Sequence, residues 1–107
     1  SIDFKEKWIE PTKLVKEMLA IANSGGGIII FGVKEKEDKS FSYDGIEEIV
    51  DKAKISNDIK NYISTELKYE VYDFVYDSSE YEQRKIRRRS YNLRTRRSNP
   101  YSERDGR

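Results

Sequence analysis

The fold of this chain is decided by residues 14–33, LVKEMLAIANSGGGIIIFGV. Apolar side chains recur there at three- and four-residue spacing from Leu14 to Ala22, which predicts an amphipathic helix over residues 11–23. Three glycines follow, and residues 28–33 then form an almost continuous apolar segment. Such a run bounded by glycine is typical of a buried strand. We therefore expect a helix, a glycine corner and a central strand in succession.

The two ends of the predicted helix carry residues suited to its start and its stop. Pro11 fits the first helical turn, and Glu10 or Thr12 can accept a hydrogen bond from an unpaired amide. The glycine corner leaves a helix C-terminus, whereas phosphate-binding loops enter a helix N-terminus, so we expect no nucleotide and no other cofactor. Within the strand, a glycine admits another backbone or marks a bulge. The structural signature comprises Asn23, Gly25, Gly26, Gly27 and Gly32.

Shorter patterns lie on both sides of this unit. Residues 2–8 alternate apolar and polar side chains, which indicates a short edge strand, and residues 34–42 suit a hairpin or a long loop. A second helical stripe runs over residues 46–53, and Ser56 or Asn57 can cap a third helix; the two are alternatively one kinked helix.

The C-terminal half predicts two more strands. Residues 69–76 alternate as a strand with Tyr72, Phe74 and Tyr76 on one face; residues 77–82 predict a turn, and residues 84–97 a largely solvated return strand. We expect the tyrosines of the first strand, Tyr69, Tyr72 and Tyr76, to belong to the core; a stacking platform for bases is the alternative. The predicted fold class is α+β: a small mixed or mostly antiparallel sheet of about four to six strands packed by two or three helices.

Composition narrows the classes of function. A length of 107 residues predicts a single domain over 1–107, and the absence of cysteine and histidine excludes disulfides, thiolate metal sites and the commonest general base. The longest apolar run is too short to cross a membrane, and the acidic start does not resemble a signal peptide. We expect a cytoplasmic protein that binds no metal and no membrane.

Charge divides the chain after Gln83. Residues 1–83 hold 11 lysines, no arginine and 18 acids, whereas residues 84–107 hold nine arginines, one lysine and two acids. This asymmetry predicts contacts with a nucleic-acid backbone; the alternative is a solvated edge strand with a partly disordered or atypical tail over 84–107. If about five cations neutralise phosphates, log affinity should fall with log salt at a slope of about −4 to −5. The predicted contacts are Arg84, Lys85, Arg87, Arg88, Arg89, Arg94, Arg96 and Arg97.

The glycine corner also carries a family resemblance. Residues 20–33, AIANSGGGIIIFGV, resemble the central signature of the Schlafen-type AlbA domain, in which a helix ending "AFANT-GG" leads into a strand "LLIGV". The segments DFK (3–5), DGI (44–46) and NPY (99–101) are similar to further elements of that family. The resemblance implies a mixed sheet with packed helices that binds DNA or RNA, often as one module of a larger protein such as a transcriptional regulator.

Two other functions stay open. Some Schlafen members cleave RNA with acidic residues near the opening strand and an aspartate after the "GV"; here Asp3 matches one acid, but Lys34 occupies the place of the aspartate. A lysine opposes a divalent cation, so we expect no enzyme and no catalytic residue. The third hypothesis is a structural or oligomerisation module, whose exposed strands pair with a second copy in a homo-oligomer.

Overall fold

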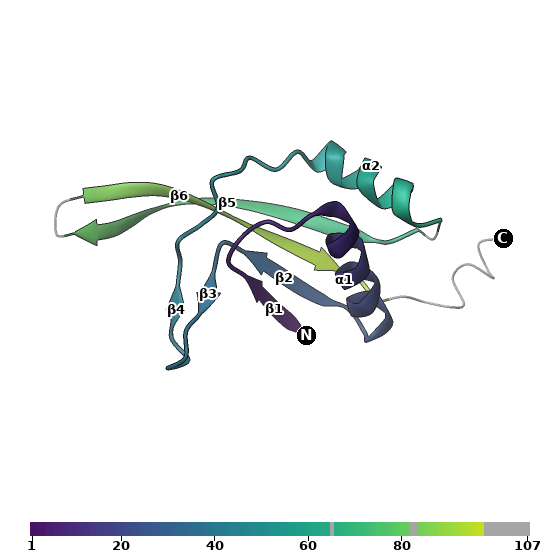
Figure 1. Ribbon diagram of the computed structural model, residues 1–107, viewed down its shortest axis with the longest axis horizontal. Helices are drawn as coiled ribbons and strands as arrows, with labels where there is room; N and C mark the ends of the chain where they lie inside the picture. Colours follow the sequence, from purple (N-terminus) through teal and green to yellow (C-terminus); the bar gives the residue numbers. More distant parts are fainter. Residues whose placement is uncertain (65, 82–83, 98–107) are drawn as a thin grey trace.

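Two helices cover one face of a four-stranded sheet (Figure 1). A computed structural model describes residues 1–64, 66–81 and 84–97, and for residues 79–81, 84 and 85 it describes the backbone alone. The sheet has the strand order β1-β2-β6-β5, in which β1 and β2 run parallel and the other neighbours are antiparallel. A hairpin of two short strands forms a second sheet. The predicted α+β class, with a small mixed sheet, is confirmed. The strands are β1 (Ile2–Lys5), β2 (Gly27–Phe31), β3 (Lys34–Glu35), β4 (Phe41–Ser42), β5 (Tyr69–Tyr81) and β6 (Arg84–Thr95).

The segment quoted first folds as its pattern predicts. Helix α1 (Pro11–Asn23) ends at the glycines, and β2 leaves them as an interior strand of the sheet. Strand β1 is an edge strand beside it. The predicted side-chain cap is wrong: Glu10 is the N-cap residue but makes no capping hydrogen bond, because Thr12 Oγ1 donates to its carboxylate at 3.3 Å.

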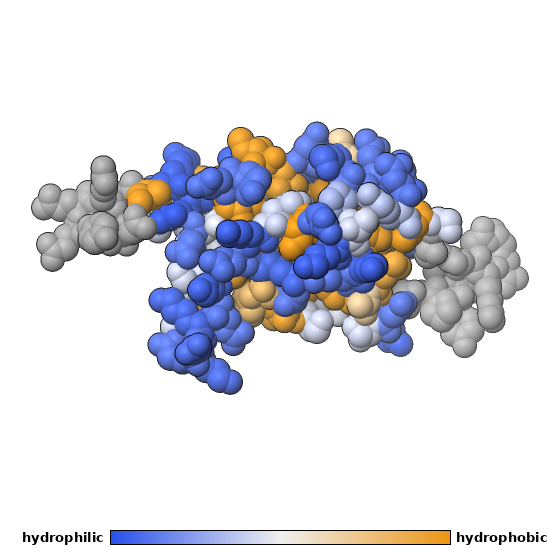
Figure 2. Space-filling model, viewed as in Figure 1, coloured by the Kyte–Doolittle hydropathy of each residue, from blue (hydrophilic) through white to orange (hydrophobic). Residues whose placement is uncertain are grey.

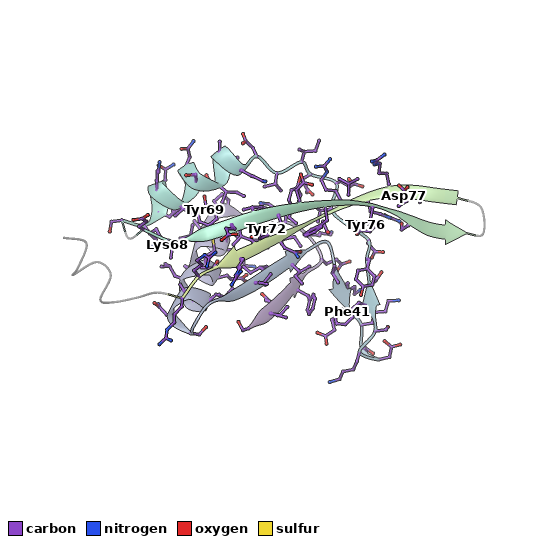
Figure 3. All side chains as sticks on the ribbon, turned by 180° about the vertical axis from the view of Figure 1, so that it is seen from behind. Phe41, Lys68, Tyr69, Tyr72, Tyr76 and Asp77 are labelled. Carbon is purple, nitrogen blue, oxygen red and sulfur yellow. The ribbon has the colours of Figure 1, made fainter. Side chains whose placement is uncertain are left out.

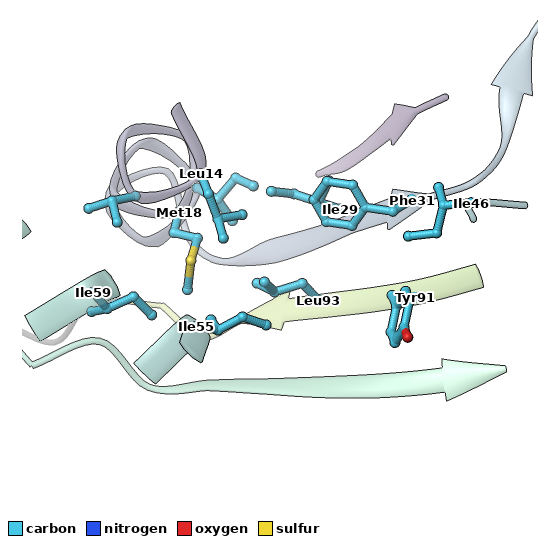
Figure 4. Packing of buried hydrophobic residues seen from close by; sticks show 11 residues of the cluster. Leu14, Met18, Ile29, Phe31, Ile46, Ile55, Ile59, Tyr91 and Leu93 are labelled. Carbon is cyan, nitrogen blue, oxygen red and sulfur yellow. The ribbon is translucent and has the colours of Figure 1, made fainter. Parts of the chain in front are cut away.

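The core lies between the helices and one face of the sheet (Figure 4). Alternate residues of β2 and β6 point into it, so Ile29 and Leu93 are fully buried. Helix α2 (Lys52–Tyr62) adds Ile55 and Ile59 from above the same face. Alternation sends every second side chain to the opposite face, which neither α1 nor α2 covers. The largest fully buried side chains are Leu14, Met18, Ile29, Phe31, Tyr91, Leu93 and Thr95.

The predicted helix over residues 46–53 is wrong, because β6 binds the backbone of this segment. The Ile46 amide donates to the Arg89 carbonyl oxygen at 2.8 Å, and the Val50 amide donates to the Tyr91 hydroxyl at 2.9 Å. These amides are therefore used by the sheet and not by a helix. Ile49, a member of the predicted stripe, is 80% exposed.

The start of α2 also differs from its prediction. Asp51 is the N-cap residue, and its carboxylate accepts a hydrogen bond from the Ala53 amide at 2.9 Å. Ser56 and Asn57, the predicted caps, lie inside the helix. Asp51 lies five residues before Ser56, and an aspartate caps an unpaired helix amide as well as Ser or Asn does. The helix therefore begins about one turn sooner than predicted.

Strands β5 and β6 form a long antiparallel ladder that extends beyond β2 as a two-stranded arm. The predicted turn over residues 77–82 is wrong as far as Tyr81, since β5 continues to that residue. The predicted solvated edge strand is also wrong, because β6 pairs with β2 and β5 and its Tyr91, Leu93 and Thr95 are buried. The NPY element (99–101) and the rest of the predicted tail lie outside the described residues. None of the helices in the described part of the chain is long and apolar enough to cross a membrane.

Candidate functional site

The predicted basic residues lie on β6 or directly after it, and they fall into two groups. Arg87, Arg88 and Arg89 belong to the two-stranded arm, where β6 pairs with β5 alone. Arg94, Arg96 and Arg97 lie at the other end of β6, beside the glycine corner. Between Arg89 and Arg94 the extended backbone covers about 17 Å. Arg84 and Lys85 belong to the arm by their backbone, and their side chains lie outside the described residues.

On the arm, internal contacts hold two of the three arginines. Arg89 Nη1 forms an ion pair with Asp73 Oδ2 at 2.8 Å. Arg88 donates from Nε to Ser78 Oγ and from Nη1 to the Asp44 carbonyl oxygen, both at 3.0 Å. Arg87 is exposed and makes no hydrogen bond or ion pair with a described residue. Arg88 and Arg89 therefore tie the arm together, which leaves Arg87 available to a partner.

At the glycine corner, an acid holds one arginine and leaves its neighbours unpaired. Arg96 forms an ion pair with Glu70, whose other oxygen accepts a hydrogen bond from the Tyr72 hydroxyl. The Tyr72 bond first, and the Arg96 bond second, lower the pKa of the Glu70 carboxyl. Arg94 and Arg97 are exposed and form no ion pair with a described residue. The site thus keeps two guanidinium groups with no ion pair to a described residue, beside one neutralised pair.

The arginines at the corner line a hollow of about 580 Å³ together with the glycines. Gly26 has φ +91°, and a Cβ there would lie 2.9 Å from the Arg97 nitrogen and 3.1 Å from the Thr95 carbonyl oxygen. The end of β6 therefore passes directly against the corner, which only glycine permits. Within the predicted signature, Gly26 is thus the residue that lets the backbone of Thr95, Arg96 and Arg97 pass close to the corner.

A second close backbone contact lies at the start of the arm. Gly32 has φ +98°, and a Cβ there would lie 2.9 Å from Gly45 Cα, while the Gly45 amide donates to the Gly32 carbonyl oxygen at 2.8 Å. Of the two predictions for Gly32, close approach of another backbone is confirmed. Asn23 is the last residue of α1 and has no positive φ.

Aromatic residues of β5 gather on the face of the sheet opposite the helices, which we call the helix-free face, and not in the core as the first of the two predictions had it. Figure 3 shows Tyr72 and Tyr76 on β5 and Phe41 on β4. Tyr72 and Phe74 are 43% and 47% exposed, so the predicted place of Tyr72 in the core is wrong; Tyr69, on the other face, packs against the core. The alternation of Tyr72, Phe74 and Tyr76 was visible in the sequence. The missing information was that both helices lie on the opposite face.

The acids near the opening strand lie close to lysine side chains. Asp3 Oδ2 lies 3.3 Å from Lys5 Nζ, and Lys34 lines a hollow of about 330 Å³ with Asp3 and Glu6. Among the residues that the structure describes, no group of three acidic side chains is arranged to hold a metal ion. The β3–β4 hairpin beside it is covered by hydrophilic side chains (Figure 2). This edge of the sheet therefore differs in chemistry from the arginine-bearing end.

Comparison with known proteins gives one finding about the whole chain. A protein-family model described as Schlafen, AlbA_2 matches residues 1–106. No curated protein matches the chain. The matched range includes the glycine corner, the helix-free face and every arginine of β6. The resemblance predicted from residues 20–33 is therefore confirmed.

Proposed function

The chain belongs to the Schlafen AlbA_2 family, and from this premise we propose that it binds nucleic acid through arginines of β6 and the helix-free face of the sheet. Membership of this family is consistent with a nucleic-acid-related role. The observation that carries the proposal is the pair Arg94 and Arg97, both exposed and free of ion pairs with described residues, beside a hollow of about 580 Å³. Arginine suits phosphate because its planar fork donates two parallel hydrogen bonds.

The proposal divides the predicted basic residues by role. Arg94 and Arg97 contact phosphates, whereas Arg89 and Arg96 first neutralise Asp73 and Glu70. Alternation along β6 places Arg87 on the opposite face of the arm, away from the proposed contacts. Fewer phosphate contacts follow than the sequence alone predicts, so the salt slope should be shallower than −4 unless Arg84 and Lys85 also contribute. In this function the chain is a DNA- or RNA-binding module of a larger protein such as a transcriptional regulator. Its lack of cysteine fits a cytoplasmic location.

Fluorescence anisotropy with labelled single- and double-stranded DNA and RNA tests this proposal. We expect Arg94→Gln to weaken binding and to reduce the salt slope by about 0.7 to 0.9, since one phosphate contact is lost. The matched control is Lys16→Gln, which removes the same charge from an exposed position on α1. Equal losses for the two variants would show that only net charge matters, and absence of binding to all four nucleic acids would end the proposal.

We also propose that this binding is not accompanied by RNA cleavage. Lys34 supports this, because it lines the same hollow as Asp3, Glu6 and Glu35, and its ammonium group opposes a divalent cation there. Incubation of RNA with the chain and Mn²⁺ or Mg²⁺ should give no more cleavage than the Asp3→Ala variant gives. Cleavage that Asp3→Ala abolishes would assign a nuclease instead.

A further inference from the structure

A hollow of about 610 Å³ opens on the helix-free face, separate from the hollow at the glycine corner. One wall comes from the β3–β4 hairpin and the residue after it, with Phe41 and Tyr43; the opposite wall comes from β5, with Phe74 and Tyr76. Ser90 and Asn92 of β6 line it between these walls, and one acidic residue, Asp77 of β5, belongs to its lining. The hollow is thus a cleft with aromatic walls and a polar strip.

The walls of this aromatic hollow are fixed by contacts that do not involve a ligand. The Tyr76 hydroxyl donates to the Tyr43 carbonyl oxygen at 3.1 Å, and Arg88 Nη1 donates to the Asp44 carbonyl oxygen at 3.0 Å. Phe41 also packs against Phe4, with ring centroids 4.8 Å apart. These contacts join the hairpin to β1, β5 and β6. The cleft is therefore formed before any ligand arrives, which lowers the entropic cost of binding.

The rings of the aromatic hollow are accessible to solvent. Phe74 is 47% exposed and Tyr43 is 58% exposed, whereas the aromatic residues of the covered face, Phe31 and Tyr91, are almost fully buried. Flat apolar surface of this kind stacks well on another flat ring. Among the described residues the Asn92 side-chain amide has no hydrogen-bond partner, so it offers both a donor and an acceptor in the cleft.

Positive charge lies along the same row of the sheet. Asn92 and Arg94 are two residues apart on β6, so their side chains share one face at a spacing of about 7 Å. A ligand whose flat polar ring occupies the cleft could place an anionic group on Arg94. Repeating aromatic rings joined by phosphates have this layout, and they are the units of a nucleic-acid strand.

We propose that the aromatic hollow holds unpaired nucleobases, so that the chain binds single-stranded nucleic acid in preference to a duplex. This inference rests on the proposed function, because it names the class of nucleic acid whose phosphates the arginines bind. In a duplex the bases stack on each other and their pairing edges are occupied, so the rings of the cleft would meet only backbone. In a single strand a base stacks on an aromatic ring while its edge meets Asn92.

Four labelled 12-nucleotide probes test the inference by anisotropy: single-stranded RNA, single-stranded DNA of the same sequence, the DNA duplex, and a DNA strand in which abasic sites replace all the bases. The abasic strand keeps the phosphates and removes the stacking partners. We expect both single strands to bind more tightly than the duplex and the abasic strand. The RNA and DNA arms show whether the 2′-hydroxyl contributes.

Two variants test whether the preference for base-containing single strands arises in the aromatic hollow. Phe74→Ala should weaken binding of the base-containing strands about tenfold and leave binding of the abasic strand within about twofold, because one stacking contact is lost. Tyr43→Ala, on the opposite wall, should act in the same direction. The control is Tyr62→Ala, which removes a ring of similar exposure, 52%, from α2 and should leave all four affinities unchanged.

The failures of the two proposals are distinguishable. If Arg94→Gln weakens binding but the abasic strand binds as tightly as the base-containing strands, the proposed function stands and the inference is overturned. Tighter binding of the duplex overturns it as well. If light scattering shows a dimer that Phe74→Ala dissociates, the hollow is a contact between two copies and the inference is wrong. If no probe binds, both proposals fail.

Discussion

The two faces of the four-stranded sheet are made by the same strands and have opposite properties. On the covered face of β6, Tyr91 and Leu93 are at most 1% exposed and contact the helices. On the helix-free face, Arg94 is exposed and Asn92 is half-buried beside Tyr72 and Phe74. Neighbouring residues of one strand therefore serve the fold and the candidate site in turn. Changes at alternate positions should separate stability from binding.

The largest effect should come from the covered face. Leu93 is fully buried, so Leu93→Ala should lower the free energy of unfolding by about 2–5 kcal/mol through lost burial and a cavity. Its neighbour Arg94→Ala should change that free energy by no more than about 0.5 kcal/mol. Urea denaturation monitored by circular dichroism measures both. A similar cost for the two variants would contradict the division between the faces.

A smaller effect on the free energy of unfolding should come from the glycine corner. Gly25 and Gly26 both have positive φ, but a Cβ at Gly25 would have no atom within 4 Å, whereas one at Gly26 would meet the end of β6. We expect Gly25→Ala to cost about 1–2 kcal/mol from backbone strain alone. Gly26→Ala should cost about 1 kcal/mol more, because its Cβ would also clash with the end of β6.

The same pair of variants also tests the role of the corner in binding. Because Gly26 contacts the backbone of Arg97, Gly26→Ala should weaken nucleic-acid binding under conditions where both variants are folded. Gly25→Ala should bind as the unaltered chain does. If both variants bind equally well, the corner supports the fold and does not position the arginines.

The smallest effect concerns Glu70, the acid that keeps Arg96 engaged. Glu70→Gln removes a negative charge from the helix-free face and should raise affinity about threefold at low salt, since that charge repels approaching phosphates. This increase in affinity should disappear at high salt, where the charges are screened. Anisotropy at two salt concentrations measures this; unchanged affinity at low salt would mean that phosphates do not approach this end of β6.

Glu70 also gives stability a defined dependence on pH. Hydrogen bonds from Tyr72 and Arg96 lower the pKa of its carboxyl in the folded state. A lowered folded-state pKa stabilises the fold above the unfolded-state value, and the contribution disappears as pH falls through the folded-state value. Between neutral pH and the acid range, Glu70→Gln should therefore lose less stability than the unaltered chain. An identical pH profile would contradict this ion pair.

Prediction from sequence succeeded where one local pattern controls the structure. The apolar spacing from Leu14 to Ala22 and the three glycines predicted α1 and its end, and alternation predicted the two faces of β5. Prediction failed at residues 46–50, where the Ile46 and Val50 amides hydrogen-bond to β6. That contact joins residues about 40 positions apart, so no local pattern could indicate it.

The candidate site was predicted by residue type but not by arrangement. The arginines were identified, yet their density made β6 look like a solvated edge, although Tyr91, Leu93 and Thr95 are buried. Three apolar or small residues on alternate positions suffice to bury one face of a strand. The acids that pair with Arg89 and Arg96 lie on β5, and the strand register decides which arginines they hold.

One measurement tests the central claim most directly, namely that the helix-free face is the face that binds nucleic acid. The ¹⁵N-labelled chain is titrated with a 12-nucleotide single strand, and amide shifts are followed by NMR. We predict that the Asn92 side-chain amide and the backbone amides of β5 and β6 shift, while those of α1 and α2 do not. Shifts confined to the helices, with none at Asn92, would contradict the account.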